Sequence, residues 1–591
     1  MEVPGSSGTN SAVHGGRPGS VLQLGLRMKG TPDPITLALT GQLPFVLLVA
    51  AILALPLSLF LLWLYRRAVL RSMRGRSGTA VPSTPSVQAS SPPSSRIELS
   101  FDGASACPTL VPYGEALLRQ ASRGPWQAAA IYCAAGGFYA FVMSLVWLVA
   151  TRSSFHPVRF LWLFWTYAWP VVLTANLVAG STKRKKAYVA SGYFAVLGVL
   201  AAIALELSPK LTLWQLIIAH WLVMNGPPTV LLLAFLVRRI RAVGPLVITF
   251  MVVGVMGSVV GLSIAGRSDR ILRYLAGVCV RMGFSGKTMF WLLILIGFII
   301  FGVVGWAVLQ GVRRLYERKL ISDQSLTCDS IWLLFSIVQT IDLVFEGWWW
   351  IFTGLAGFII YKAVVKIGFS WLHRGQTAYQ APKLLLLRVF SLGKRSGHLF
   401  NALGKHWLRT GSVRMIAGPD LATSTVEPHE FLDFLSGKLS RRFIDGPEAL
   451  DLRLREMDTR PDWDGRFRVT DFFCHDDTWK MVLARLIGES DAVLMDLRGF
   501  SQRNAGCSHE IEELLNIAPL GRVVFVVDST TDVAFLDGVA KAGWSRLPMD
   551  SPNRERESSQ LRLFRFTGSH SAELAQLLRW VCAAAGETSA V

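Results

Sequence analysis

Two carboxylates, Asp496 and Glu510, stand in a segment whose pattern could support chemistry, SDAVLMDLRGFSQRNAGCSHEIEELL. Asp496 ends an apolar run typical of a buried strand, and Glu510 lies in the first turn of the helix predicted after it. The positive end of a helix dipole keeps an acid in that turn ionised. An ionised carboxylate at a sheet edge could stabilise, or attack, the oxocarbenium-like centre that forms when a ribosyl bond is cleaved.

These acids also have a purely structural interpretation. Glu510, Glu512 and Glu513 would complement the helix dipole, as first-turn acids do in many helices without a catalytic role. The residue types and their spacing do not choose between the two interpretations. Asp496 and Glu510 are therefore candidate catalytic residues, with helix stabilisation as the alternative.

The region that positions these residues, 380–591, alternates short apolar runs with helical patterns. Such alternation predicts a parallel sheet covered by helices on both faces, a doubly wound α/β domain. Ligands of these domains bind beyond the carboxyl ends of the strands. The predicted strands are 383–390, 413–421, 466–473, 491–497, 522–528 and 561–566.

The segments that follow these strands could hold a nucleotide. The segment 391–397, SLGKRSG, opens a helix, so its amides and basic side chains could bind a phosphate, and a solvated turn is the alternative. The candidate nucleotide-binding residues are Ser391, Gly393, Lys394, Arg395, Gly418, Asp420, Phe500 and Ser501. The seven cysteines form no CxxC pair and no metal-ligand spacing with histidine, so we predict reduced thiols, no metal site and no required cofactor.

Residues 43–366 have the composition of a membrane protein. Apolar runs of about twenty residues, the length of a membrane span, fill this region and raise the hydrophobic content of the chain to 51%. The segment 329–366 is predicted to form a hairpin of two spans that turns at Glu346 and Gly347, which brings the predicted spans to nine. The others are 43–65, 127–150, 158–180, 188–206, 211–237, 243–265 and 288–311.

The chain thus divides into five predicted parts, the last of them the doubly wound domain. They are a disordered leader at 1–42, a first transmembrane helix at 43–65, a Ser/Pro-rich cytoplasmic linker at 66–126, a multi-span region of about eight helices at 127–366, and the α/β domain at 380–591. Within the linker, residues 76–97 are expected to be disordered. The expected partner of the helical region is a lipid bilayer.

The basic residues predict the orientation of the spans. Basic clusters follow the first, third, fifth and seventh spans, as cytoplasmic loops do. We therefore expect the N-terminus outside and the α/β domain in the cytoplasm, at a bacterial inner (plasma) membrane. The loop 266–287 breaks the pattern, and we interpret it as an amphipathic helix in the membrane interface or as the sign of a miscounted span.

The formal charge of +20 does not predict nucleic-acid binding. The region from residue 380 onward holds 27 of the 60 Lys and Arg residues and 28 of the 40 Asp and Glu residues. The positive excess therefore belongs to the membrane region, where topology explains it.

Polar residues inside the predicted spans offer a second kind of site. Asp342, His220 and the NGPP motif at 225–228 could mark a transport path, because a proline pair breaks a helix and frees backbone carbonyls. Each residue also fits ordinary helix packing, and the hydropathy pattern shows no inverted repeat.

The segment around Glu510 resembles Toll/interleukin-receptor (TIR) domains, in which a strand ending near a serine precedes Trp-Cys-x-x-Glu-Leu at the next helix. Cys507 and Glu510 match the Cys and Glu of that motif, and Gly506 stands in place of the tryptophan. The segment 384–403 is similar to the family's first strand, loop and helix. The segment around Glu510 also resembles nucleoside deoxyribosyltransferase-like proteins, in which an Asp-ended strand precedes a Glu at a helix start.

Both families act on N-glycosidic bonds to ribose, so the resemblance implies that Glu510 acts on NAD as substrate, or on a related nucleotide, in signalling or defence. Many TIR domains only assemble with one another, which implies a non-enzymatic scaffold that self-associates as the alternative. Lys394 and Arg395 depart from the family, since many TIR domains carry an acid in this loop. A transporter with a regulatory cytosolic domain is the third hypothesis.

Overall fold

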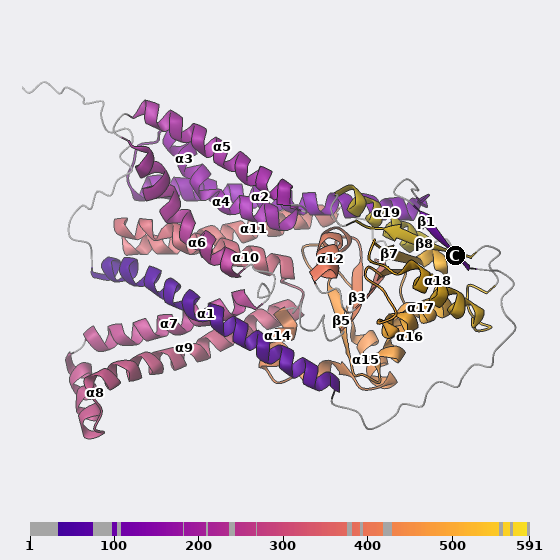
Figure 1. Cartoon of the computed structure of the whole chain (residues 1–591). Coiled ribbons are helices and arrows are strands. Elements are labelled where there is room, and N and C mark those ends of the chain that lie inside the picture. The colour runs from indigo at the N-terminus through magenta and orange to yellow at the C-terminus, as the bar shows by residue number, and fades with distance from the viewer. Residues whose placement is uncertain are drawn as a thin grey trace, which may run out of the picture.

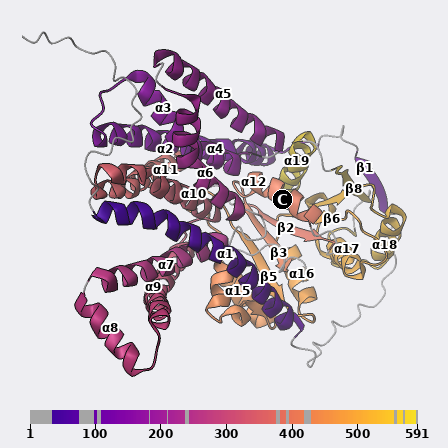
Figure 2. The same cartoon turned by 60° about the vertical axis from the view of Figure 1, so that its left-hand side comes forward.

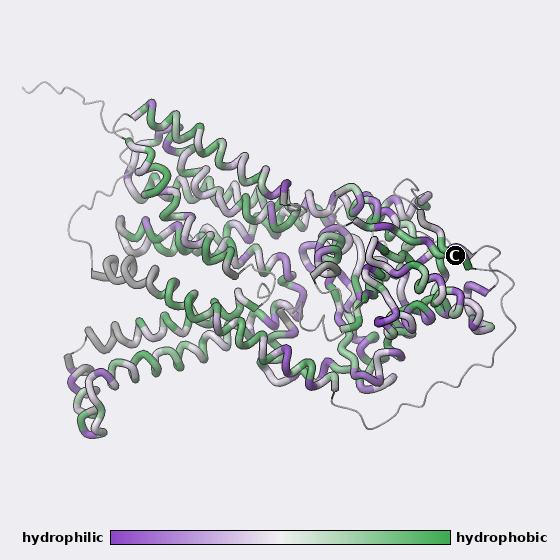
Figure 3. Tube along the Cα trace, in the orientation of Figure 1, coloured by the Kyte–Doolittle hydropathy of each residue, from purple (hydrophilic) through white to green (hydrophobic). Residues whose placement is uncertain are grey.

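The structure is a computed structural model in which a bundle of long helices adjoins a sheet layered between helices (Figure 1). Colouring by hydropathy distinguishes the two parts, since the bundle is largely apolar and the sheet region is mixed (Figure 3). The described residues are 34–74, 97–102, 108–180, 183–208, 211–235, 243–267, 269–374, 381–389, 394–417, 428–554, 559–567 and 571–587.

Within these residues, eight helices are long and apolar enough to cross a membrane, the layout of a multi-pass membrane protein. The one predicted span that is not among these eight, 243–265, corresponds to α7, whose apolar part is shorter. Residues 34–42 of the predicted leader belong to α1, and residues 1–33 lie outside the described part. The bundle helices are α1 (Pro34–Arg74), α2 (Pro112–Ala150), α3 (Pro157–Tyr167), α4 (Trp169–Val178), α5 (Lys183–Leu207), α6 (Val223–Phe235), α7 (Gly244–Arg267), α9 (Gly286–Glu317), α10 (Asp323–Thr340) and α11 (Phe352–Arg374).

The predicted hairpin of two spans is confirmed. After α10 the chain makes two 3-10 turns, Asp342–Glu346 and Trp348–Ile351, and α11 then begins. Gly347 stands between the turns with φ +152°, a conformation that residues with a side chain rarely adopt. The helix predicted within 266–287 is α8 (Asp269–Arg281), which joins α7 to α9 at the end of the bundle far from the sheet (Figures 1 and 2).

The proline pair does not break its helix, contrary to the prediction. Pro227 and Pro228 lie inside α6, and the distortion falls just before it, in the π-helical segment Gln215–Leu222. A proline removes one backbone donor and crowds the carbonyl four residues earlier. The π-helical segment ends at Leu222, directly before the two residues whose carbonyls the prolines crowd, Val223 and Met224.

All pairings in the described sheet are parallel, in the order β1-β8-β7-β6-β2-β3-β5-β4. The six predicted strands are present, and they are joined by β1 and by β4, whose two residues are too few to form a sequence pattern. The strands are β1 (Ile97–Asp102), β2 (Lys383–Arg388), β3 (Ser412–Ala417), β4 (Phe443–Ile444), β5 (Val469–Cys474), β6 (Ala492–Asp496), β7 (Val523–Val527) and β8 (Ser559–Arg565).

Both faces of the sheet are covered, because apolar residues alternate between them. Leu385 and Leu387 of β2 pack into a core with the helices of one face, whereas Leu384 and Leu386 pack with those of the other. The first face carries α15 (Pro447–Glu456), α16 (Trp479–Gly488), α17 (Ala505–Ile517) and α18 (Val533–Ser545). The second carries α12 (Lys394–Trp407), α19 (Ser571–Glu587) and the first half of α2.

The segment 66–126 is a linker only in part. Residues 66–74 continue α1, residues 97–102 form β1 against β8, and residues 112–126 begin α2, where Leu117 is buried in the sheet's core. Most of the stretch predicted to be disordered, 76–96, lies outside the described residues, and Ile97 starts β1. The domain predicted at 380–591 is therefore incomplete without residues that precede most of the membrane helices.

Buried polar contacts join the bundle to the sheet domain. Ser322, which caps α10, donates from Oγ to Asp464 Oδ2 at 2.7 Å. The guanidinium of Arg409 donates to Gln324 Oε1 of α10 at 2.8 Å. The last turns of α1 pack against the ends of β3, β4 and β5. The two parts thus meet as one packed unit.

Candidate functional site

The order of the strands reverses between β2 and β6. From β2 the chain passes through α12 to β3 on one side, and from β6 it passes through α17 to β7 on the other. In open parallel sheets, ligands bind at the carboxyl ends of the strands that flank such a reversal. Arg388 and Asp496 end these two strands and are partners in register. The reversal therefore places two charged residues side by side.

Glu510 lies deeper than its sequence position predicts. The helix α17 begins at Ala505, so Glu510 is in the second turn, and its residue is only 3% exposed. Burial raises the pKa of the Glu510 carboxyl to about 8, and the charge of Arg388 opposes part of that rise. The prediction of an ionised first-turn acid is corrected: Glu510 is mainly protonated at neutral pH.

The carboxyl group of Glu510 is not fully satisfied. Its Oε2 has no hydrogen-bond partner among the described residues. One turn earlier, Cys507 Sγ donates to the carbonyl of Arg388 at 3.8 Å, so this face of α17 lies against the end of β2. Buried polar atoms without partners are rare, and each calls for a ligand, a water or a strained contact.

Asp496 is held by a neighbouring cation. The Asp496 side chain is fully buried, and Arg498 donates to it from Nε at 2.8 Å and from Nη2 at 2.7 Å. Both carboxylate oxygens are thereby engaged in a bidentate pair. This geometry assigns Asp496 to holding the loop after β6, and the predicted catalytic role gains no support from it.

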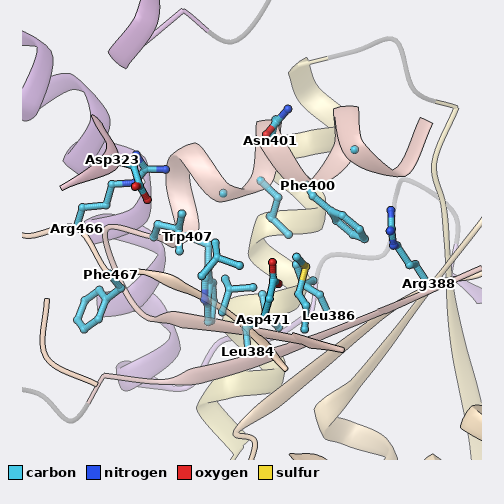
Figure 4. Close-up of a pocket in the computed structure, with 17 residues that line it drawn as sticks. Asp323, Leu384, Leu386, Arg388, Phe400, Asn401, Trp407, Arg466, Phe467 and Asp471 are labelled. Carbon is cyan, nitrogen blue, oxygen red and sulfur yellow. The ribbon is translucent and has the colours of Figure 1, made fainter. Parts of the chain in front are cut away.

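A cavity of about 190 Å³ runs from Arg388 along the sheet beneath α12 (Figure 4). Leu384 and Leu386 of β2 form its floor, and Phe400 and Trp407 of α12 line it from the other side. The Arg388 guanidinium lies 6.0 Å from the centre of the Phe400 ring. The cavity is therefore apolar along its walls and cationic at the end that reaches the strand reversal.

Three further charged residues stand among the apolar residues that line this cavity. Asp471 of β5 lies between the two ends, and Asp323 and Arg466 stand together at the end away from Arg388 (Figure 4). Burial, and next the charge of Glu430, raises the pKa of Asp471 well above its ordinary value, while Arg388 opposes the rise. Arg388 thus acts on two carboxyl groups, Asp471 and Glu510.

Sequence reasoning missed Arg388 and Asp471. A signal was present, because each is a charged residue inside an apolar strand pattern, LLLLRVF for Arg388 and RVTDFF for Asp471. Burying a charge in such a run costs free energy, so the residue needs a partner group or has a function. Most candidate residues predicted from the sequence follow the strands, whereas Arg388 and Asp471 lie within them.

The predicted nucleotide-binding residues do not come together in the described structure. Phe500 is fully buried against Phe535, with ring centres 5.4 Å apart, and belongs to the core. The Ser501 amide and hydroxyl both donate to Asn504 Oδ1, which shapes the loop before α17. Lys394 and Arg395 open α12, but the structure does not describe their side chains. The remaining candidates, Ser391, Gly393, Gly418 and Asp420, lie outside the described residues.

The polar residues of the bundle form interhelical contacts. Trp162 Nε1 donates to His220 Nδ1 at 3.3 Å, and Gln339 Nε2 donates to Asn225 Oδ1 at 3.0 Å. Trp147 Nε1 lies 3.5 Å from Asp342 Oδ2. These contacts join α2, α3, α10 and the distorted fifth span, as polar residues do in packed membrane helices.

The described residues contain no group of three or more His, Cys, Asp or Glu side chains arranged to hold a metal ion. Comparison of the chain with protein-family models, with curated proteins and with solved structures found no match.

Proposed function

We propose that this multi-pass membrane protein binds a small anionic ligand of the nucleotide class at Arg388, with the α/β domain in the cytoplasm and the bundle as its membrane partner in signalling. One observation carries the proposal: a cationic side chain closes one end of a cavity with mostly apolar walls at the point where the strand order reverses. Arginine is well suited to recognise phosphate or carboxylate groups.

The size of the cavity limits the ligand. Pockets for whole cofactors usually have volumes of about 300–1,000 Å³. The cavity beneath α12 has about 190 Å³, enough for a ribosyl phosphate or for one end of a nucleotide. A dinucleotide such as NAD would extend out of it at the carboxyl edge of the sheet.

The strand order supports a doubly wound domain that binds a ligand at its strand reversal. The six longer strands after the bundle, β5-β3-β2-β6-β7-β8, have the order 3-2-1-4-5-6 when they are numbered along the chain among themselves. Dinucleotide-binding folds have this order, and flavodoxin-like domains have the order 2-1-3-4-5; both classes bind ligands at the reversal. The TIR-like character of the domain is proposed from the sequence resemblance alone, with β1 and β4 as additions at the two edges.

We further propose that Glu510, which lies on α17 near the end of β2 and does not line the cavity beneath α12, is a proton donor in the cleavage of an N-glycosidic bond in the part of a ligand that extends out of that cavity. The C1′–N bond would break with its electron pair passing to the base, Glu510 would protonate the base, and water would add to C1′ and return a proton to Glu510. Nicotinamide leaves NAD as a neutral molecule and needs no proton, whereas a purine or pyrimidine does. The raised pKa therefore favours a nucleoside or nucleotide over NAD as substrate.

The test uses the full chain in detergent, because β1 and α2 complete the sheet. We expect AMP or ADP-ribose to raise the melting temperature and a nucleotide to release its base. Arg388→Gln should abolish the shift, Glu510→Gln should keep the shift and lose base release, and Arg562→Gln on the exposed side of β8 should change neither. If AMP, ADP-ribose and NAD all leave the melting temperature unchanged and stay intact at high protein concentration, the proposal fails and the self-assembling scaffold becomes the better hypothesis.

A transport function is the second candidate, because the distorted fifth span carries His220 and Asn225 in a buried polar network. Transport predicts that Asp342→Asn stops solute flux into proteoliposomes while Arg388→Gln does not. The ligand-binding proposal predicts the reverse pattern in the thermal-shift assay.

A further inference from the structure

A second cavity lies where the bundle meets the sheet domain. It has a volume of about 270 Å³ and is enclosed between the end of α4, the start of α5, Pro125 of α2 and one side of α12. Basic side chains from three separate parts of the chain line it: Lys186 of α5, His398, Lys405 and Arg409 of or just after α12, and Arg466 before β5. We call this space the basic cavity.

The charge of the basic cavity is one-sided. No acidic side chain lines it in the part of the chain that the structure describes. Lys405 Nζ donates to the carbonyl of Gly180 at 2.6 Å, which holds its charge at the junction of α4 and α5. After burial, the charges of Lys405 and Lys185 contribute to lowering the pKa of His406, as a positive local field would.

The nearby carboxylates lie outside the basic cavity. Asp464 accepts hydrogen bonds from Ser322 and offsets the buried charge of Arg409. Asp323 lines the cavity beneath α12, beside Arg466 (Figure 4). Lys186, Lys405 and Arg466 therefore bring basic side chains to a cavity that no acidic side chain of the described residues lines.

The basic cavity lies at the level of the lipid headgroups. The apolar span through α3 and α4 ends at Val178, and the next span begins at Arg184, so the cavity falls between the two boundaries. Trp126 and Tyr188, which stand close in sequence to the lining residues Pro125 and Lys186, are 60% and 75% exposed. Exposed Trp and Tyr are typical of the membrane–water interface.

We propose that the basic cavity binds a phosphate group, and that its source is the headgroup of an anionic phospholipid. Basic pockets between membrane helices at the cytoplasmic boundary are suited to such headgroups. The inference does not rest on nucleotide binding at Arg388. A bound phosphate would link α5 to α12, and Arg466 and Asn401, which line both cavities, would connect it to the cavity that reaches Arg388.

The test compares the full chain in nanodiscs of phosphatidylcholine alone with nanodiscs that also contain phosphatidylglycerol. We expect the anionic lipid to raise the melting temperature and one phosphatidylglycerol to stay bound in native mass spectrometry. The double variant Lys186→Gln/Lys405→Gln should lower retention of that lipid about tenfold or more, since each cation near the membrane surface contributes appreciably to anionic-lipid binding. Inorganic pyrophosphate added in detergent forms the second arm; if it stabilises the protein and the lipid does not, the site holds soluble phosphate instead.

The matched control is Arg184→Gln/Lys480→Gln, which removes the same charge from the same helix α5 and from an exposed position on α16, outside the basic cavity. Equal retention in both double variants, or no response to either phosphate source, overturns the proposal. Lys405→Arg keeps the charge and should retain binding, which distinguishes a lost site from a misfolded protein, as does an unchanged melting temperature in phosphatidylcholine alone.

Discussion

Arg388 and Glu510 show how position in the fold changes the chemistry of a residue. In the sequence, Glu510 is an acid near a helix start, and in the structure it is a buried carboxyl group facing the field of a buried arginine. Desolvation outweighs the helix dipole, because the dipole acts within the first turn and contributes at most about 1–2 kcal/mol. The consequence is a carboxyl group that is mainly protonated at neutral pH, in place of an anion.

Glu510→Gln should change how stability depends on pH. The unfolded carboxyl has its ordinary pKa of 4.5 and the folded one a pKa of about 8. The folded state therefore binds the extra proton between these values, and stability falls as pH rises through this window, by up to about 1.4 kcal/mol per unit. The glutamine variant should lack this slope when denaturation midpoints are measured from pH 5 to 8. Parallel curves for the two proteins would show that Glu510 is ionised in the fold.

Asp496 and Arg498 form a buried ion pair whose loss should strongly lower the free energy of unfolding. Arg498→Ala leaves the buried Asp496 carboxylate without its bidentate partner, which should lower the free energy of unfolding by about 3–5 kcal/mol. Lys541→Ala breaks an exposed pair with Asp537 and should cost less than about 1 kcal/mol. Similar costs for both variants in chemical denaturation would contradict the structural role given to this pair.

At the scale of elements, β1 and the contact between α7 and α9 depend on partners distant in sequence. The run IELSFD becomes a strand only because β8 offers an open parallel edge. The two helices approach closely at glycines, where a Cβ on Gly297 would stand 2.5 Å from the carbonyl oxygen of Gly257. Membrane helices often pack through such small residues.

Ile97→Ala should destabilise the sheet domain by about 2 kcal/mol or more, because Ile97 is buried in the core with residues of the α16–α18 face. Glu98→Ala, at the exposed neighbouring position, should stay within about 0.5 kcal/mol of the parent. Thermal unfolding of the full chain measures both. If Ile97→Ala does not change the stability, residues 97–102 belong to the linker and not to the sheet.

Gly297→Ala should force α7 and α9 apart and lower stability by about 1–3 kcal/mol, as overpacking does. Gly311→Ala lies in the same helix, where an added Cβ meets nothing within 4 Å, and should be neutral or slightly stabilising. The melting temperature in detergent distinguishes them, and equal effects would argue against the close contact.

At the scale of the whole molecule, the helix bundle and the sheet domain share a polar boundary. Asp464 accepts from Ser322 of the bundle and offsets the charge of Arg409, which in turn donates to Gln324. The end of α1 reaches the carboxyl edge of the sheet, where His475 Nδ1 lies 3.0 Å from the Ser72 carbonyl. A ligand at that edge would therefore bind to a domain that packs directly against the membrane helices.

Asp464→Ala should separate the unfolding of the two parts. It removes the carboxylate that accepts from Ser322 and offsets the buried charge of Arg409, which should lower the free energy of unfolding by about 1–3 kcal/mol. Calorimetry should then show two transitions where the parent shows one, with faster trypsin cleavage between residues 455 and 470. Asp451→Ala, at an exposed pair, serves as the control. A single unshifted transition in Asp464→Ala would mean that this boundary is weak.

The sequence by itself determined the division into apolar helices and an alternating α/β region, the six main strands, and the hairpin turn at Glu346 and Gly347. Hydropathy and periodicity are properties of short segments, so a single sequence is enough to reveal them. The sequence placed Glu510 near the start of the helix after β6, but it could not give the burial that sets the protonation of that residue.

Only the tertiary structure decided the rest. β1 needed the open edge of β8, the basic cavity needed Lys186, Lys405 and Arg466 from three separate parts of the chain, and the cavity at Arg388 needed β2, β5 and α12 brought together. Pairing, desolvation and the summed field of charges depend on neighbours in space, and spacing along the chain does not encode them.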